Sequence, residues 1–296
     1  MSAKVKNAMT VDVEDYFHVS AFAKTIDKND WKTLKPTVEY NTKKILNLFA
    51  QHNVKATFFI LGWVARAYPD LIRTIHNSGH EIASHGFEHT RITEQTRDEY
   101  IFDVSRSIST IEDIIGDKIL GYRAPSFSIN ETTVWAYQVL AELGIKYSSS
   151  TYPICHDLYG EPSWPRFPHS RKEGILEIPI STIKKGNKNV GIGGGGYFRL
   201  YPYFFSKNRI NSYHQHETHP YNFYFHPWEI DPNQPRISNA PLLSKIRHYT
   251  NLNRMENKLR LLIQDFNFST MKDVYLTNST FPIYPKQDVI LGSCDG

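Results

Sequence analysis

Apolar and polar positions alternate in blocks through the first half of the chain. Short apolar runs typical of strands lie at residues 9–13, 54–61, 80–84, 119–122 and 145–148. Segments with apolar residues at helical spacing separate them, at residues 38–51, 69–76, 96–115 and 132–143. Repeated strand–helix units with short connections predict an α/β fold on a parallel sheet, either open or closed into a barrel.

The middle of the chain loses this alternation. Residues 152–168 hold four prolines and residues 191–196 are almost all glycine, so both predict loops laid over the scaffold. After them we expect a strand at 222–225 and one basic amphipathic helix around 242–266. Because no internal repeat or long linker is present, residues 1–296 are expected to form a single domain with loop insertions. Its C-terminal extension, about residues 240–290, is expected to be helical.

Composition narrows the class of protein. Hydrophobic residues make up 40% and charged residues 22% of the 296 residues, which is typical of a globular chain. The net charge of +4 includes no Lys/Arg run of five, so no nucleic-acid partner is expected, although an anionic substrate or acidic membrane surface is compatible. Two cysteines exclude a disulfide framework. With no signal-like or transmembrane segment, we expect a cytoplasmic protein that could work at the inner face of the membrane.

The histidines are the first candidates for chemistry. Because the chain has thirteen, one His-x-x-x-His pair is weak evidence by itself. His76 and His80 straddle a helix-stop signal and are not expected to share a face. His85 and His89 follow a predicted strand, and one turn of helix there would point both imidazoles the same way, as in metal sites. The alternative is two exposed loop histidines.

Acidic residues at the first strand supply a possible third ligand. Asp12 lies inside an apolar run, where a carboxylate is unfavourable unless it pairs or binds something. Period-2 geometry places Asp12 and Glu14 on one side of the strand and Asp15 on the other. One acid could hold a metal while a second acts as a base; the alternative is an acidic strand end in solvent.

Two more polar residues follow predicted strands. Arg123 lies before the rigid turn at Pro125, and His226 ends the strand at 222–225. Alone, they would be a surface arginine and a core histidine. Together with the acids and histidines above, they place polar groups at the ends of four separate strands, where parallel α/β folds and barrels carry their sites. The glycines at 193–196 lack a phosphate-loop pattern and favour a mobile flap or close backbone approach to a ligand.

Four segments in order resemble the motifs of a known family. They are Thr10-Val-Asp-Val-Glu-Asp15, Ala56-Thr-Phe-Phe59, His80-Glu-Ile-Ala-Ser-His-Gly-Phe-Glu-His89 and Tyr122-Arg-Ala-Pro125. They are similar to the carbohydrate esterase family 4 polysaccharide deacetylases, the NodB homology domain. Residues 194–199 and 225–235 resemble the subgroup of bacterial exopolysaccharide loci, including exosortase-associated members. The resemblance covers about residues 9–270, with the catalytic motifs within 9–230, and implies a distorted (β/α) barrel.

The resemblance also implies roles for particular residues. His85 and His89 would be metal ligands, Asp12 the catalytic base, Arg123 the residue that orients it, and His226 the general acid. The metal would be a divalent cation, with zinc as the expected ion.

The third ligand and one further position depart from the family pattern. Strand alternation favours Glu14 as the ligand, whereas the family's adjacent acids favour Asp15, so one of the two is expected. Ser148 stands where related sequences usually have an aspartate, which puts one groove-lining or base-orienting contact in doubt.

The implied activity is N-deacetylation of an amino sugar by metal-activated water. The substrate would be an N-acetylated saccharide or precursor, lipid-linked or nucleotide-linked. Substrate contacts are expected from Pro125, Tyr197, Trp164 and Trp228. The alternatives are an amidohydrolase that acts on a non-sugar amide and a saccharide-binding relative without catalysis.

Overall fold

A curled, mainly parallel sheet organises the chain. The computed structural model describes residues 5–157, 159–277 and 281–284. The strands in sheet order are β10 (Asn222–Phe225), β1 (Lys6–Val13), β2 (Thr57–Ile60), β3 (Glu81–Ser84), β4 (Gly121–Tyr122), β5 (Tyr147–Ser148), β7 (Leu176–Glu177) and β6 (His169–Ser170). All neighbours are parallel except β6 and β7. The sheet therefore forms an open half-barrel, which confirms the predicted fold class.

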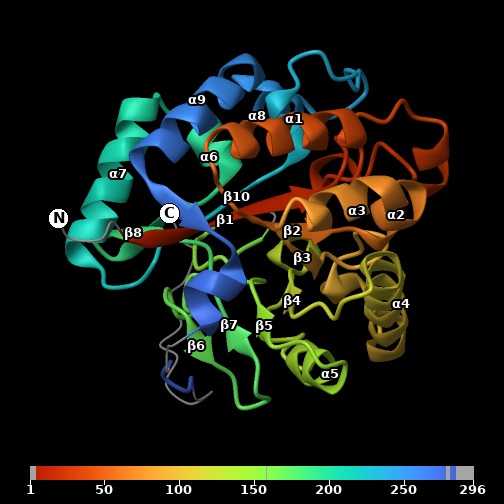
Figure 1. The fold of residues 1–296 in the computed structure, drawn as a ribbon, viewed down its shortest axis with the longest axis horizontal. Coiled ribbons are helices and arrows are strands. Elements are labelled where there is room, and N and C mark those ends of the chain that lie inside the picture. Colours follow the sequence, from red (N-terminus) through yellow and green to blue (C-terminus); the bar gives the residue numbers. More distant parts are fainter. Residues whose placement is uncertain (1–4, 158, 278–280, 285–296) are drawn as a thin grey trace.

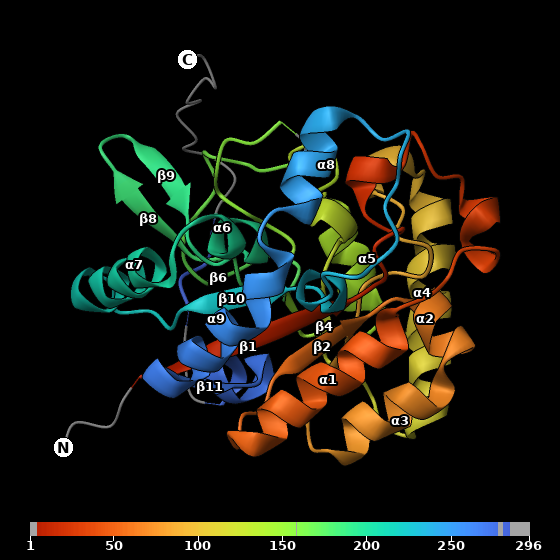
Figure 2. The same cartoon turned by 90° about the horizontal axis from the view of Figure 1, so that it is seen from above.

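Helices lie around the outside of this curve (Figures 1 and 2). They are α1 (Val38–Gln51), α2 (Gly62–Ala67), α3 (Pro69–Asn77), α4 (Arg97–Ile115), α5 (Ala136–Glu142), α6 (Gly195–Leu200), α7 (Tyr203–His216), α8 (Leu242–Tyr249) and α9 (Leu252–Asp265). Short 3-10 turns lie at Ser20–Phe22, Lys28–Lys32, Ile92–Glu94, Pro125–Phe127 and Pro227–Ile230, and a π turn at Lys272–Leu276. A separate hairpin pairs β8 (Thr182–Lys185) with β9 (Lys188–Gly191).

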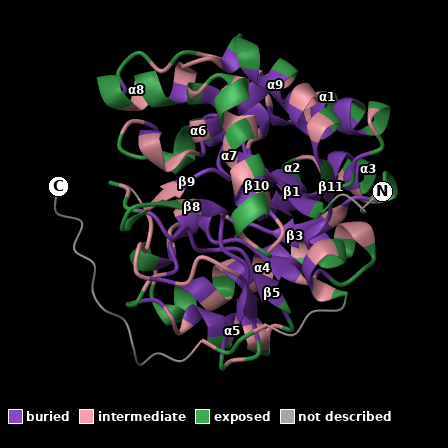
Figure 3. Ribbon diagram, turned by 90° about the vertical axis from the view of Figure 1, so that its left-hand side faces the viewer, coloured by how far each residue is buried: buried purple, intermediate pink, exposed green. Residues whose placement is uncertain are grey.

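Local sequence accounts for the predicted elements that formed. The helical pattern at 38–51 became α1 with the same bounds. In α4, Thr96 and Glu99 form a capping box, and Gly116 ends the helix at φ +75°. The apolar stripes of these helices pack on the sheet in one large core (Figure 3).

Several predictions for the second half were wrong. The glycine run is not all loop, because α6 begins at Gly195, where a Cβ would lie 2.3 Å from a carboxylate oxygen of Glu229. The single helix expected at 242–266 is two helices, since Asn251 adopts φ +56° between α8 and α9. Helix α7, with few buried residues, was not expected.

The C-terminal extension is not wholly helical. Strand β11 (Asn267–Ser269) pairs in parallel with residues 6–8 at the start of β1, so the extension contributes a strand to the sheet. Residues 278–280 and 285–296, including part of the predicted extension and Cys294, lie outside the described residues. Cys155 is exposed. Among the described residues, no helix has the length and apolar character needed to cross a membrane.

Candidate metal centre and catalytic site

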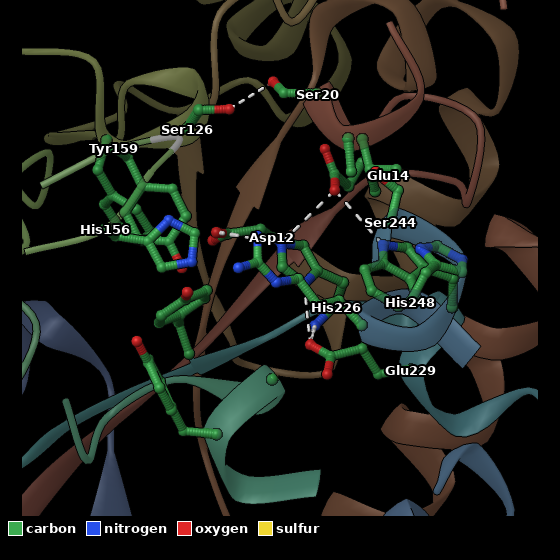
Figure 4. A pocket seen from close by; sticks show the side chains of 18 of the residues that line it. Asp12, Glu14, Ser20, Ser126, His156, Tyr159, His226, Glu229, Ser244 and His248 are labelled. Atoms are coloured by element: carbon green, nitrogen blue, oxygen red, sulfur yellow. Dashed lines mark hydrogen bonds and ion pairs between the residues drawn. The ribbon is translucent and has the colours of Figure 1, made fainter. Parts of the chain in front are cut away.

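The carboxyl ends of four parallel strands meet at one cavity of about 480 Å³. Asp12 lies near the end of β1, His85 follows β3, Arg123 follows β4 and His226 follows β10. All but Arg123 line the cavity wall, where Asp12 and His226 face each other (Figure 4). Arg123 lies behind that wall, fully buried. The structure therefore brings together the four strand-end groups that the sequence singled out.

Three of the cavity residues form a possible metal site. One ligand atom each from Glu14, His85 and His89 lie within 4.8 Å of one another, and all three side chains are buried. Glu14 Oε2 is 2.8 Å from His89 Nε2, yet this buried oxygen makes no well-formed hydrogen bond. Two imidazoles and one carboxylate are a donor set suited to a divalent cation such as zinc. The residues present therefore fit the expected metal.

Hydrogen bonding prepares His85 for this role. Its Nδ1 lies 2.8 Å from the backbone oxygen of Arg123, so Nδ1–H donates and Nε2 keeps its lone pair. Burial lowers the pKa of His85 to about 4, although neighbouring Asp12 works in the opposite direction. A neutral imidazole with Nε2 free is the form that binds a metal.

The segment that carries the two histidines is a loop, not the expected turn of helix. Gly86 has φ +76° and His89 has φ +52°, so two residues of the segment have left-handed backbone conformations that a helical turn does not contain. The Asp103 carboxylate fixes the loop by accepting from the backbone N–H groups of Phe87 and Glu88. The imidazole centroids of His85 and His89 are 5.3 Å apart. Tertiary hydrogen bonds thus produce the convergence that a helical turn was expected to give.

Glu14 and Asp15 have different environments. Glu14 points into the cavity; burial disfavours its charge, but the nearby His89 and His226 outweigh this and hold its pKa well below the usual range. Asp15 accepts hydrogen bonds from Thr37 N, Thr37 Oγ1 and Val38 N at the start of α1. Of the two acids that the sequence left open, the structure brings Glu14 to the histidines and uses Asp15 to hold a helix end.

Asp12 is paired with Arg123 in the interior. Arg123 Nη1 donates to Asp12 Oδ1 at 2.5 Å and to Thr10 Oγ1 at 2.9 Å. The same guanidinium donates to the backbone oxygen and hydroxyl of Ser149 and lies 4.0 Å from the Phe59 ring centroid. These contacts fix Oδ1 and leave Oδ2 facing His226 Nε2, 4.0 Å away.

His226 is held by a carboxylate to which the sequence pattern had assigned no role. Its Nδ1 lies 2.9 Å from Glu229 Oε1, and its backbone N–H donates to the same oxygen. Its Nε2 lies 3.5 Å from Glu14 Oε1. Burial alone would lower the pKa of His226, but these carboxylates outweigh it and raise the pKa to about 9.

Arg199 completes this arrangement. Its Nε donates to Glu229 Oε2 at 2.6 Å, and the rest of the guanidinium donates to backbone oxygens of Arg247, His248 and Thr250. Burial opposes ionisation of Glu229, yet Arg199 lowers its pKa below the usual value. The His-Pro-Trp-Glu spacing, with Pro at the first position of a turn and Glu three residues after His, is the signal that could have identified Glu229.

The expected substrate contacts divide into two groups. Tyr197 and Trp228 line the cavity, together with Tyr159 and Tyr224, which were not expected from the sequence. Trp228 is stacked on the rings of His226 and His248, and only 6% of it is exposed, so little of its ring is left for a sugar.

Trp164 and Pro125 lie outside the cavity wall. Trp164 packs in the main core, and Pro125 is buried between residues that do line the cavity. Ser148 is buried and donates to Ser150 Oγ, which in turn accepts from Ala124 N next to Arg123. The position that departs from the family pattern therefore supports the backbone beside Arg123.

Fold and site together define an α/β half-barrel with a possible metal site at its strand ends. A family profile described as "Polysaccharide deacetylase" matches residues 20–148, and one described as "Domain of unknown function (DUF3473)" matches residues 149–276. Residues 20–148 are thus similar to polysaccharide deacetylases, and the second matched region follows them directly. His226 and Glu229 come from that second region, so both matched parts build the cavity.

Individual relatives are similar over part or all of the chain. A peptidoglycan-N-acetylglucosamine deacetylase from Bacillus cereus is 40% identical over 92 residues, which are 31% of this chain and 31% of that protein. A crystal structure from Mycobacterium smegmatis, assigned to the polysaccharide deacetylases, matches with TM-score 0.65 and 17% identity over 98% of this chain and 96% of that one. A family 4 carbohydrate esterase from Streptomyces lividans matches with TM-score 0.50 and 13% identity over 95% and 100%. These structural matches support the fold.

Proposed function

We propose that this protein is a metal-dependent N-deacetylase that removes acetyl groups from an N-acetylated amino sugar. The observation that carries the proposal is the opposed pair Asp12 and His226, with the ligand set of Glu14, His85 and His89 beside it in one cavity. The Bacillus cereus relative, which acts on N-acetylglucosamine by its name, supports the substrate class.

Each residue has a distinct task in amide hydrolysis. A divalent cation held by Glu14, His85 and His89 would lower the pKa of water and polarise the amide carbonyl. Asp12 accepts the proton of the attacking water, and the hydrogen bond from Arg123 holds that carboxylate in place. A general base is expected to contribute roughly 10²–10⁴ in rate.

His226 completes the reaction from the other side of the cavity. Glu229 holds Nδ1–H, so the ring is doubly protonated when Nε2 also carries a proton. That Nε2 proton is then available for the departing amine, because carboxylates raise the pKa of His226. The products are acetate and a free amino sugar.

Other features bear on the metal and the substrate. Two histidines and one carboxylate favour zinc and leave coordination positions open, as catalytic zinc sites do. The partly exposed aromatic side chains of Tyr159 and Tyr197 offer apolar surface for a sugar ring. A role in exopolysaccharide synthesis, with a lipid-linked or nucleotide-linked precursor as the substrate, is the finer form of this proposal.

The test is acetate release from soluble N-acetylglucosamine oligomers. Wild-type protein should release acetate, lose this activity after chelation and regain it with zinc. His85→Ala should lose both metal and turnover, whereas His76→Ala should keep both, because His76 pairs with Asp117 on the surface. Full activity in metal-free protein would refute the proposal. If the protein releases acetate from a small non-sugar amide but from no oligomer, its substrate is a non-sugar amide and the proposed substrate class is wrong.

A further inference from the structure

The solvent-facing side of α8 is unusually apolar. Leu242, Leu243 and Ile246 are 71%, 55% and 55% exposed, although the helix has only eight residues. At about 100° per residue, these three side chains form one stripe about 100° wide. His248, on the opposite side, is buried. Figure 3 shows α8 largely in the colour of exposed residues, at an edge of the molecule.

The inward side of α8 is fixed. Arg199 donates to the backbone oxygens of Arg247 and His248, and His248 Nε2 lies 2.7 Å from Gln234 Oε1. The helix therefore cannot turn its apolar stripe inward without breaking buried hydrogen bonds. The exposure of the stripe is a property of the folded protein.

Positive charges flank the stripe. Helical spacing places Lys245 on one border and Arg247, which pairs with Asp157, on the other. Between Asp231 and Glu256 the sequence contains four cationic residues, Arg236, Lys245, Arg247 and Arg254, and no acidic residue. An apolar stripe bordered by cations is the pattern of a helix that lies in the interface of an anionic bilayer.

The same surface reaches the cavity. Ile246 lines the cavity mouth, as does Leu200 of α6, which is 56% exposed. Ser244 and His248 of α8 face the cavity in Figure 4. A surface docked through Leu242 and Leu243 would therefore lie next to the opening that leads to Asp12 and His226.

We propose that the exposed stripe of α8 docks the protein onto an anionic lipid bilayer, so that the cavity opens toward the headgroup layer. Docking itself does not depend on the catalytic activity. Its use, delivery of a saccharide carried on a lipid, rests on the proposed function.

Vesicle binding of the full-length protein tests the docking. Wild type should sediment with vesicles of phosphatidylcholine containing one third phosphatidylglycerol, and less with phosphatidylcholine alone or at high salt. Leu242→Ser combined with Leu243→Ser should weaken binding roughly tenfold or more. Phe102→Ser is the matched control, because Phe102 is 67% exposed on the distant helix α4 and should leave binding unchanged.

Activity separates the two proposals. The double variant should release acetate from soluble oligomers as wild type does, because neither leucine lines the cavity, but should be slower on an N-acetylglucosamine glycolipid in anionic vesicles. If wild type releases no acetate from any substrate, the proposed function fails and vesicle binding still decides the docking. Wild type that does not bind anionic vesicles, or a double variant that binds equally well, would overturn the docking. So would a wild-type dimer that the double variant abolishes, with no vesicle binding, because the stripe would then join two copies.

Discussion

Exchanging the neighbouring acids Glu14 and Asp15 for their amides should have opposite consequences. Glu14→Gln removes one of the three groups that converge on the metal position. Removing a residue that hydrogen-bonds to a metal ligand typically reduces metal affinity by roughly 10–100-fold. Removing a ligand itself should therefore reduce the affinity more. Asp15→Asn should leave metal binding intact and lower the free energy of unfolding instead.

The size of the Asp15 effect follows from its contacts. One carboxylate oxygen accepts from Tyr16 N and Thr37 Oγ1, and the other accepts from Thr37 N and Val38 N. In Asp15→Asn, the more favourable orientation of the amide places its NH₂ group toward Thr37 Oγ1. The Thr37 hydroxyl can rotate and accept a hydrogen bond from this group, but Tyr16 N is left without an acceptor. An unsatisfied buried donor costs about 1–3 kcal/mol. Because burial already raises the pKa of Asp15 and opposes its charge, we expect a net loss of about 2 kcal/mol.

The assay combines metal analysis with urea unfolding of the metal-free protein. Asp70→Asn is the control, since Asp70 is exposed and should change neither quantity appreciably. Asp15→Asn that loses its metal while keeping wild-type unfolding free energy would show that the assignment of the two acids is reversed.

Three further perturbations test the site and the scaffold. Asp12→Asn should keep the metal and lose roughly 10²–10⁴ in acetate release; metal loss would mean that Asp12 is a ligand. Arg199→Met should lower the free energy of unfolding by about 3–5 kcal/mol because the buried Glu229 carboxylate loses its arginine partner and keeps only His226, and adding Glu229→Gln should restore part of it in urea titrations. Burial, and to a smaller extent the nearby Lys55, lowers the pKa of His80 from 6.5 to about 4. Because the unfolded chain then binds this proton more tightly than the folded protein, the free energy of unfolding should fall as the pH drops from 6.5 to 4. His80→Asn should reduce that fall by roughly 3 kcal/mol, and an unchanged pH dependence would contradict the burial argument.

Much of the scaffold could be predicted from local sequence. Helices α1 and α4 follow from apolar spacing together with end signals such as the Thr96–Glu99 capping box. Period-2 alternation along β1 favoured Glu14 over Asp15, and Glu14 is the one of the two that lines the cavity. These features depend on residues close in sequence, where backbone geometry alone fixes which side chains share a face. The cytoplasmic location, by contrast, stays a prediction.

The site itself was decided by tertiary structure. Asp12 meets Arg123 only because β1 and β4 end at the same edge of the curled sheet, and Glu229 acquires its role from Arg199 on α6. Gly195, at the start of α6, lets Glu229 pack where a Cβ would otherwise lie. The sequence alone determined the residue types and, in the first half of the chain, the order of the elements and the faces they present. Which buried charges pair across more than a hundred residues depends on sheet order and packing, and no local pattern encodes that.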